Sequence, residues 1–156
     1  MSFRNRSVFV AIAGLASATA ASAALAATPT MPAYFGPPSK HNPVAKPGSI
    51  VYSGDGSQFF AGPKGSKFAG NLKWTTWNGT EGLSSGFQWI DDCNPSCANG
   101  KFTLYPVNLK VYRPRHVSKY FIFTRLKVTY TTSKRFGHKS TFTWNLSLSR
   151  GFFQIG

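Results

Sequence analysis

Both cysteines of the chain stand in one short segment, residues 91–100, which reads DDCNPSCANG. Thiols beside carboxylates could hold a metal ion, carry out thiol–disulfide exchange, or form a structural disulfide. A zinc site would need His116 and His138 as further ligands, but they lie far apart and Cys-x3-Cys is not the usual zinc spacing. Redox exchange normally uses Cys-x-x-Cys beside a helix, which this segment lacks.

The N-terminus helps to decide between these chemistries, because it has the layout of a secretory signal peptide. Arg4 and Arg6 form a positive start, an apolar stretch follows, and residues 24–26 give a small-x-small cleavage signal. An uncleaved membrane anchor is the less favoured alternative, since the second half of the segment is only weakly apolar. Export places Cys93 and Cys97 in an oxidising compartment. We therefore predict a structural disulfide, with a labile disulfide and a metal site as weaker alternatives.

Positive charge is the most unusual global feature of the sequence. The 156 residues include 18 Lys and Arg against 4 Asp and Glu, a formal net charge of +14. Residues 101–156 hold eleven of these cations and no acid. Such a field attracts polyanions at low salt. The alternative is that the charge only keeps an exported protein soluble.

The motifs of common enzyme classes are missing from the sequence. There is no G-x-S-x-G, no H-E-x-x-H and no phosphate-binding Gly loop. A two-carboxylate site would have to be built from four acids, most of which lie in expected turns. These acids are Asp55, Glu81, Asp91 and Asp92. We predict a non-catalytic protein without a cofactor.

The elements that must position these groups are β-strands. Beta-branched and aromatic residues dominate residues 49–156, and Gly, Asn, Ser and Pro separate the extended runs. About seven strands in about 100 residues favour an all-β domain, a small antiparallel β-sandwich or barrel. The last two runs should form a hairpin, because a short polar loop joins them. The expected strands cover residues 49–52, 71–77, 86–90, 101–105, 107–113, 119–131 and 139–148.

Residues 27–48 precede this domain and carry six of the ten prolines. Such a segment buries too little surface to offset its ordering entropy. We interpret it as a Pro-rich linker between the signal peptide (residues 1–26) and the β domain (residues 49–156). A packed N-terminal arm held through Tyr34 and Phe35 is the alternative.

Period-two alternation assigns one face of the last three strands to the core. The expected core side chains are Val107, Leu109, Val111, Tyr120, Ile122, Leu126, Val128, Tyr130, Phe142, Trp144, Leu146 and Leu148. Thr124 falls on the same face by its parity.

The opposite face, extended by an expected basic turn at residues 113–116, becomes a basic and aromatic surface. Two Phe side chains among cations on one face indicate a surface that stacks on, or inserts into, an anionic partner. The alternative is that the linker or a second sheet covers this face, so that the Phe side chains are core. The candidate binding residues are Lys110, Tyr112, Arg113, Arg115, Lys119, Phe121, Phe123, Arg125 and Lys127.

Trp74 and Trp77 are three residues apart, so on a regular strand they point to opposite faces. One of them is expected in the core. The other could be a surface aromatic that stacks on a sugar.

Two patterns in the chain resemble those of a known group of proteins. The sequence LKWTTW at residues 72–77, followed by CNPSCANGKFTLYPV at residues 93–107, resembles a family of small exported actinomycete proteins of unknown function. The match spans most of residues 55–148. The family often has another Cys before Asp-Gly, where this chain has Ser53 and Gly54, which leaves the two cysteines to pair with each other. The resemblance implies export and a β domain, and it supplies no activity.

These observations together predict an exported, non-catalytic protein, either secreted or held in the cell envelope, with no transmembrane span after signal removal. The expected partner is an anionic wall polymer, lipid head groups or an acidic protein, and not a specific nucleic acid. The alternatives are a structural or protein-interaction module with incidental charge and, less favoured, a secreted hydrolase.

Overall fold

The computed structural model describes residues 27–33, 42–64, 69–148 and 154–155, and the expected signal peptide lies outside these ranges. All regular elements in the described residues are β-strands, which confirms the all-β prediction. The strands are β1 (Ile50–Val51), β2 (Gln58–Ala61), β3 (Lys73–Trp77), β4 (Glu81–Asp91), β5 (Phe102–Val117), β6 (Tyr120–Tyr130), β7 (Thr141–Asn145) and β8 (Gln154–Ile155).

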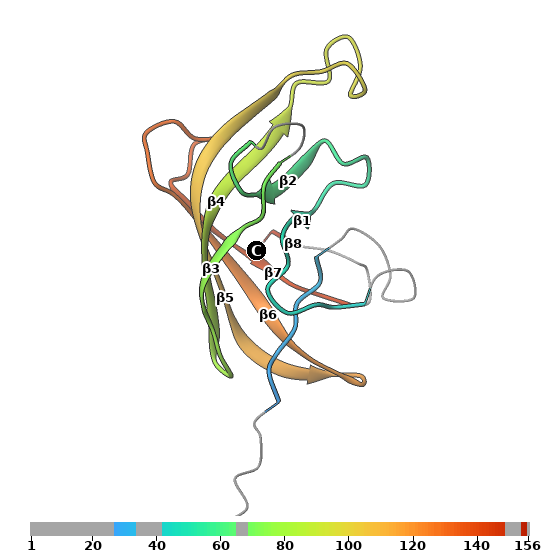
Figure 1. Ribbon diagram of the computed structural model, residues 1–156, viewed down its shortest axis with the longest axis vertical. Coiled ribbons are helices and arrows are strands. Elements are labelled where there is room, and N and C mark those ends of the chain that lie inside the picture. Colours follow the sequence, from blue (N-terminus) through green and yellow to red (C-terminus); the bar gives the residue numbers. More distant parts are fainter. Residues whose placement is uncertain (1–26, 34–41, 65–68, 149–153, 156) are drawn as a thin grey trace, which may run out of the picture.

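The strands form one antiparallel sheet in the order β1-β2-β4-β5-β6-β7-β8 (Figure 1). β3 pairs with the first half of β4, and β2 pairs with its second half. The sheet curls strongly, so that Phe60 of β2 and Trp144 of β7 meet with ring centroids 5.6 Å apart. Of the two expected architectures the structure is the barrel-like one, a half-barrel made from a single sheet.

Some strand limits differ from the sequence-based expectation. β5 is one strand that continues through Pro106 and Pro114, where we expected two strands and a turn at residues 113–116. A proline removes only one donor from a ladder, and the flanking residues keep the pairing with β4 and β6. The chain reverses instead at Ser118, whose φ of 53° fits a two-residue hairpin loop.

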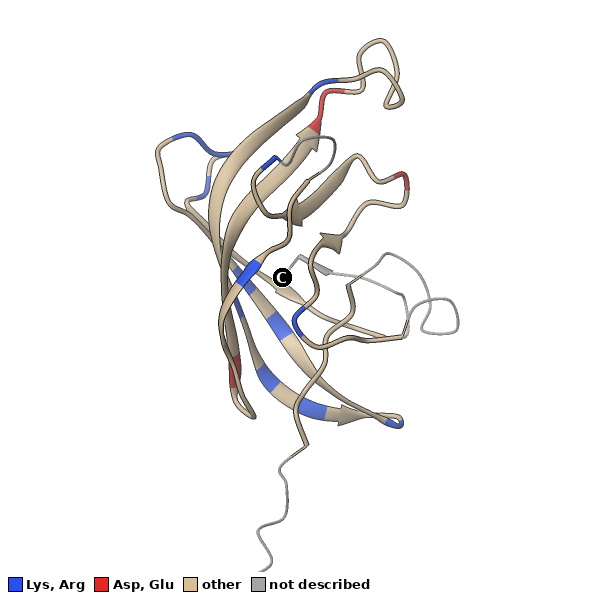
Figure 2. Ribbon diagram, viewed as in Figure 1, with Lys and Arg blue, Asp and Glu red and all other residues tan. Residues whose placement is uncertain are grey.

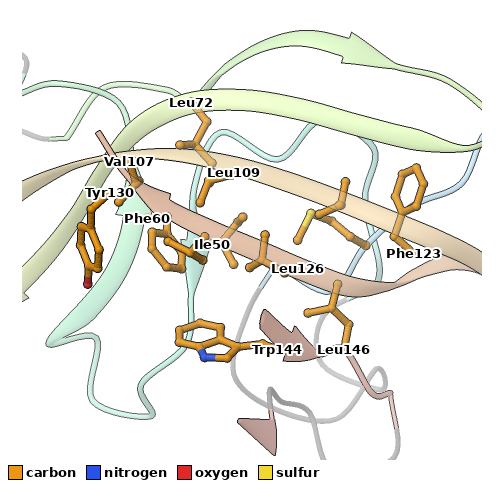
Figure 3. Close-up of a cluster of buried hydrophobic side chains, with 13 residues drawn as sticks. Ile50, Phe60, Leu72, Val107, Leu109, Phe123, Leu126, Tyr130, Trp144 and Leu146 are labelled. Atoms are coloured by element: carbon orange, nitrogen blue, oxygen red, sulfur yellow. The ribbon is translucent and has the colours of Figure 1, made fainter. Parts of the chain in front are cut away.

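The inner face of the curled sheet carries the core (Figure 3). Leu109 and Val111 of β5 lie there with Leu126 and Val128 of β6, all at most 2% exposed. The alternation predicted for these strands and the hairpin of β6 with β7 are confirmed. Ten of the twelve expected core side chains are buried, and Tyr120 and Phe142 are half-buried.

The described parts of the Pro-rich segment pack against the sheet. Met31 is 0% exposed and belongs to the core cluster. The backbone of Thr30 exchanges hydrogen bonds of 2.9 Å with Phe121 and Phe123, beyond the stretch of β6 that β7 covers. These contacts correspond to the packed-arm alternative and not to a trailing linker. They involve residues 29–33, because Tyr34 and Phe35 lie outside the described residues.

Trp74 and Trp77 hold this N-terminal arm. The register of β3 shifts between Trp74 and Thr76, and both indoles turn toward the core with centroids 4.5 Å apart. The indole N–H of Trp74 donates to the carbonyl of Pro47 at 2.8 Å, and that of Trp77 to the carbonyl of Pro29 at 2.9 Å. The expectation that the two rings occupy opposite faces is therefore wrong, because the irregularity removes the alternation on which it rested.

A buried polar chain crosses the inner side near the other end of the sheet. The hydroxyl of Tyr130 donates to the side-chain carbonyl of Gln88, which is 2% exposed. The amide of Gln88 donates to the hydroxyl of Tyr52 at 2.6 Å. Burial raises the pKa of both phenols above its ordinary value, so both stay protonated and available as hydrogen-bond donors.

If the N-terminal arm is part of the core, Met31→Ala will lower the free energy of unfolding by about 2–5 kcal/mol. Val44→Ala is the matched control, because Val44 is 38% exposed in the same segment and should change stability by about 0.5 kcal/mol or less. Urea unfolding of both variants measures the difference. Equal small losses would contradict a packed arm.

Candidate functional site

The outer face of β5 and β6 carries polar side chains between the buried ones. Because Leu109, Val111, Leu126 and Val128 point inward, their neighbours on the same strands point outward. In register, Lys110 lies directly opposite Lys127, and Tyr112 lies opposite Arg125. Figure 2 shows cations in bands along these two strands. We call this surface the basic face, defined by Lys110, Tyr112, Arg125 and Lys127.

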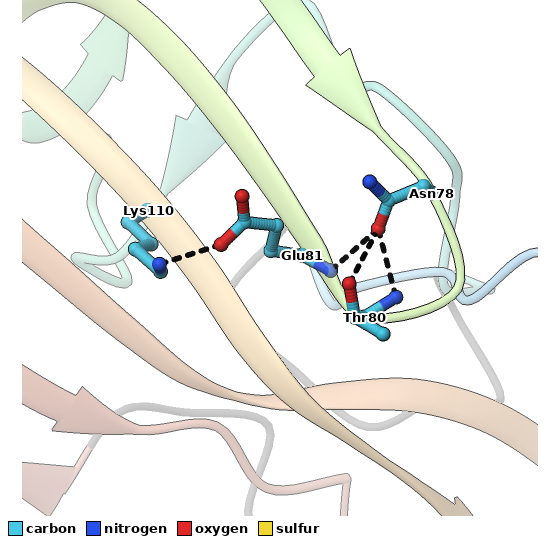
Figure 4. A network of polar contacts seen from close by, with 4 residues as sticks. All are labelled: Asn78, Thr80, Glu81 and Lys110. Carbon is cyan, nitrogen blue, oxygen red and sulfur yellow. Dashed lines mark hydrogen bonds and ion pairs between the residues drawn. The ribbon is translucent and has the colours of Figure 1, made fainter.

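One acid touches the basic face. Glu81 at the start of β4 lies 2.5 Å from the ammonium nitrogen of Lys110 (Figure 4). The side-chain carbonyl of Asn78 accepts the backbone N–H groups of Thr80 and Glu81, each at 2.9 Å, and thereby fixes the start of the strand. This is the one ion pair among the described residues, so Lys127 remains beside Lys110 without an acid of its own. Like charges directly opposite each other destabilise a sheet.

The basic face is shallow. Lys110 and Lys127 border a depression of about 440 Å³, whose other lining residues include Leu83, Asn108 and Thr129. Such a surface suits an extended partner better than a small enclosed ligand.

Three arginines meet where the basic face continues along the strands. Arg113, Arg115 and Arg125 line a depression of about 310 Å³, which we call the arginine pocket. Strict alternation would turn Arg113 inward after Val111. Instead its φ is 55°, its side chain is exposed, and its carbonyl accepts the hydroxyl of Thr124 at 2.8 Å.

The same irregularity corrects the placement of Phe123. This ring is 0% exposed and lies edge-on to Trp77 with centroids 5.3 Å apart, so it cannot contact a partner. The alternation that predicted an exposed Phe123 does not hold through Thr124, which faces the carbonyl of Arg113. Of the two alternatives weighed for this residue, burial is the one observed.

Phe121 and Lys119 lie apart from the basic face, toward the tip of the β5–β6 hairpin. Phe121 is half-buried and stacks on His116, with centroids 4.8 Å apart. Lys119 stands in the turn, its ammonium 5.3 Å from the ring of Tyr120. Eight of the nine predicted binding residues therefore follow the outer surface in two groups. The first is the basic face with the arginine pocket. The second is the hairpin tip with Lys119 and Phe121, where His116 also lies. The ninth is Phe123, which belongs to the core.

The cysteine loop is a structural element. Cys93 and Cys97 form a disulfide, as predicted, with sulfur atoms 2.06 Å apart. Asp91 accepts the N–H of Cys93 at 2.9 Å, and Asp92 accepts the N–H of Lys101 at 2.9 Å. Asp55 lies close to both sulfurs, but sulfurs joined to each other are not thiolates that could ligate a metal ion.

The four acids of the chain serve structural roles and are not gathered into one site. Asp55 accepts both the backbone N–H and the hydroxyl of Ser57, at 3.0 and 2.7 Å. These hydrogen bonds lower the pKa of Asp55 to about 2, and the N–H groups of Lys101 and Asn94 lower the pKa of Asp92. Glu81 and Asp91 stand at opposite ends of β4, about 33 Å apart along the strand.

A larger hollow opens on the other side of the molecule and was not predicted. It has a volume of about 790 Å³ and is bordered by Tyr52, Gln88, Phe142 and the exposed Phe136. Its lining comes from strands far apart in the sequence, so no local pattern signals it.

Comparisons with protein-family models, curated proteins and solved structures find no match for this chain. Within the described residues, no helix has the length and apolar character that a membrane span requires. The function is therefore inferred from the chain's own geometry.

We predict that the free energy of unfolding falls as the pH drops from about 4 toward about 2. A carboxyl group whose pKa is lowered by folding stabilises the native state while ionised, and this contribution disappears as the group is protonated. Asp55→Asn/Asp92→Asn should make the decline shallower, which acid titration followed by circular dichroism measures. An unchanged slope in the double variant would contradict the role given to these carboxylates.

Proposed function

We propose that the protein is exported and, without catalysing a reaction, binds an anionic partner in the cell envelope or outside the cell. The partner is a wall polymer, a lipid surface or an acidic protein, and the basic face is its binding surface. The observation that carries the proposal is the directly opposed pair Lys110 and Lys127, with Glu81 as the one neighbouring acid.

The energetics of this pair support the proposal. Directly opposed like charges destabilise a sheet, and Thr or Val at Lys127 would suit the strand better. Neither lysine is buried, so neither is needed for the core. A bound anion would replace the repulsion with attraction to both ammonium groups.

The spacing of the cations supports an extended partner. Arg125 and Lys127 are two residues apart on one face of β6, which corresponds to about 6.6 Å along the strand. A chain with one negative charge per repeating unit can follow such a row. Counterion release would then make the affinity fall steeply with salt.

The surroundings of the acids and histidines support a non-catalytic role. Asp55, Asp91 and Asp92 accept hydrogen bonds within turns, and Glu81 pairs with Lys110. His116 stacks on the ring of Phe121. These carboxylates are already engaged in structure.

The proposal predicts that Arg125→Gln/Lys127→Gln binds dextran sulfate, wall-polymer fractions or anionic vesicles about tenfold or more weakly at near-physiological salt. The unfolding free energy should rise by a few tenths of a kcal/mol, because the repulsion with Lys110 is relieved. Fluorescence anisotropy at two salt concentrations measures the affinities, and urea unfolding the stability.

Lys101→Gln/Lys139→Gln is the matched control, since it removes the same net charge from exposed positions away from the basic face. It should keep most of the affinity. Equal losses of affinity in both double variants would contradict a specific role of the basic face and would leave the positive charge with a general effect on solubility.

A further inference from the structure

We infer that the arginine pocket is a site for a tetrahedral oxyanion group, such as the phosphate of a phosphodiester polymer. The inference rests on the proposed function and deepens it, because it names the group that the anionic partner presents. It concerns Arg113, Arg115 and Arg125, of which only Arg125 also belongs to the basic face.

The pocket gathers donors from three strands. Arg113 and Arg115 come from β5 and Arg125 from β6, and Asn145 of β7 lies directly opposite Arg125. Each guanidinium offers a planar fork of five N–H donors. One fork satisfies a planar carboxylate, whereas the oxygens of a tetrahedral group point in several directions and are matched by several forks.

The pocket holds no neutralising group. Its lining consists of the three arginines, Thr124, Asn145 and Leu146, and no acid is among them. The one ion pair in the described part of the chain is that of Lys110. Three guanidinium groups around one depression repel one another, and an anion placed between them would convert this repulsion into attraction.

The backbone of Arg113 provides an independent observation. A φ of 55° is left-handed, which costs a side chain such as arginine about 1–2 kcal/mol and costs glycine nothing. The irregular backbone has a structural reason, since Phe123 in the opposite strand enters the core beside it. Glycine would adopt this backbone conformation with less strain, so the fold alone does not explain why the residue is an arginine. Its side chain lies in the same depression as those of Arg115 and Arg125.

The test compares polyphosphate, dextran sulfate and polyglutamate as probes of matched length. We expect Arg113→Gly to weaken binding of polyphosphate about tenfold, while polyglutamate binding falls by about threefold or less. The variant should be at least as resistant to urea as the parent protein, because glycine relieves the left-handed strain. Dextran sulfate carries tetrahedral sulfate groups, so its binding shows whether the pocket accepts tetrahedral anions in general or phosphate alone.

Two further variants keep the test independent of folding. Ser118→Gly relieves backbone strain in the same way at another left-handed residue, whose φ is 53°. It should leave the binding of all three polyanions unchanged. Arg115→Lys/Arg125→Lys keeps the charge and removes the forks, and should abolish the preference for polyphosphate over polyglutamate.

Parallel losses for all three polyanions, or a preference that survives the lysine variant, would overturn the oxyanion site. In that case Arg125→Gln/Lys127→Gln would still weaken binding, and the proposed function would stand. If that variant binds every probe as the parent protein does, the proposed function itself fails.

Discussion

A single sheet buries only the face around which it curls, and in this protein that constraint organises everything else. β4, β5 and β6 are long enough to wrap around a core, but the open side has to be covered. The N-terminal arm covers it through Met31, and the indoles of Trp74 and Trp77 fix the arm by hydrogen bonds to proline carbonyls. Where β5 and β6 alternate regularly, the apolar side chains point inward and the residues between them face solvent, and Lys110, Arg125 and Lys127 occupy such positions.

Much of this arrangement follows from alternation alone. The inward side chains of β5, β6 and β7, the last hairpin and the disulfide were predictable, because each depends on local pattern or on two residues four positions apart. The predictions that were wrong, for Phe123 and for the two indoles, depended on single irregular backbone positions. Alternation breaks down at the left-handed Arg113 and at Phe123 in the opposite strand, which is buried, and the shift in β3 puts both indoles on one face. The short strand β2 and the packing of the Pro-rich arm depend on long-range pairing, which composition does not report.

The candidate site was predictable in part for the same reason. The excess of cations after residue 100 and their place on the outer strands can be read from the sequence. The opposition of Lys110 and Lys127, and the meeting of three arginines, require the register of β5 against β6. In both places the chain accepts a cost in stability that neutral residues or glycine would avoid, which is the physical basis for assigning them to binding.

The most direct test of the account is an NMR titration of the ¹⁵N-labelled protein with a short polyphosphate at near-physiological salt. The account predicts shifts of the backbone amides of Lys110, Tyr112, Arg125 and Lys127. The amides of Met31 and Val51 on the covered inner side should remain in place. Shifts spread evenly over all exposed cations, or concentrated at the hollow around Phe136, would contradict a binding surface on the outer face of β5 and β6.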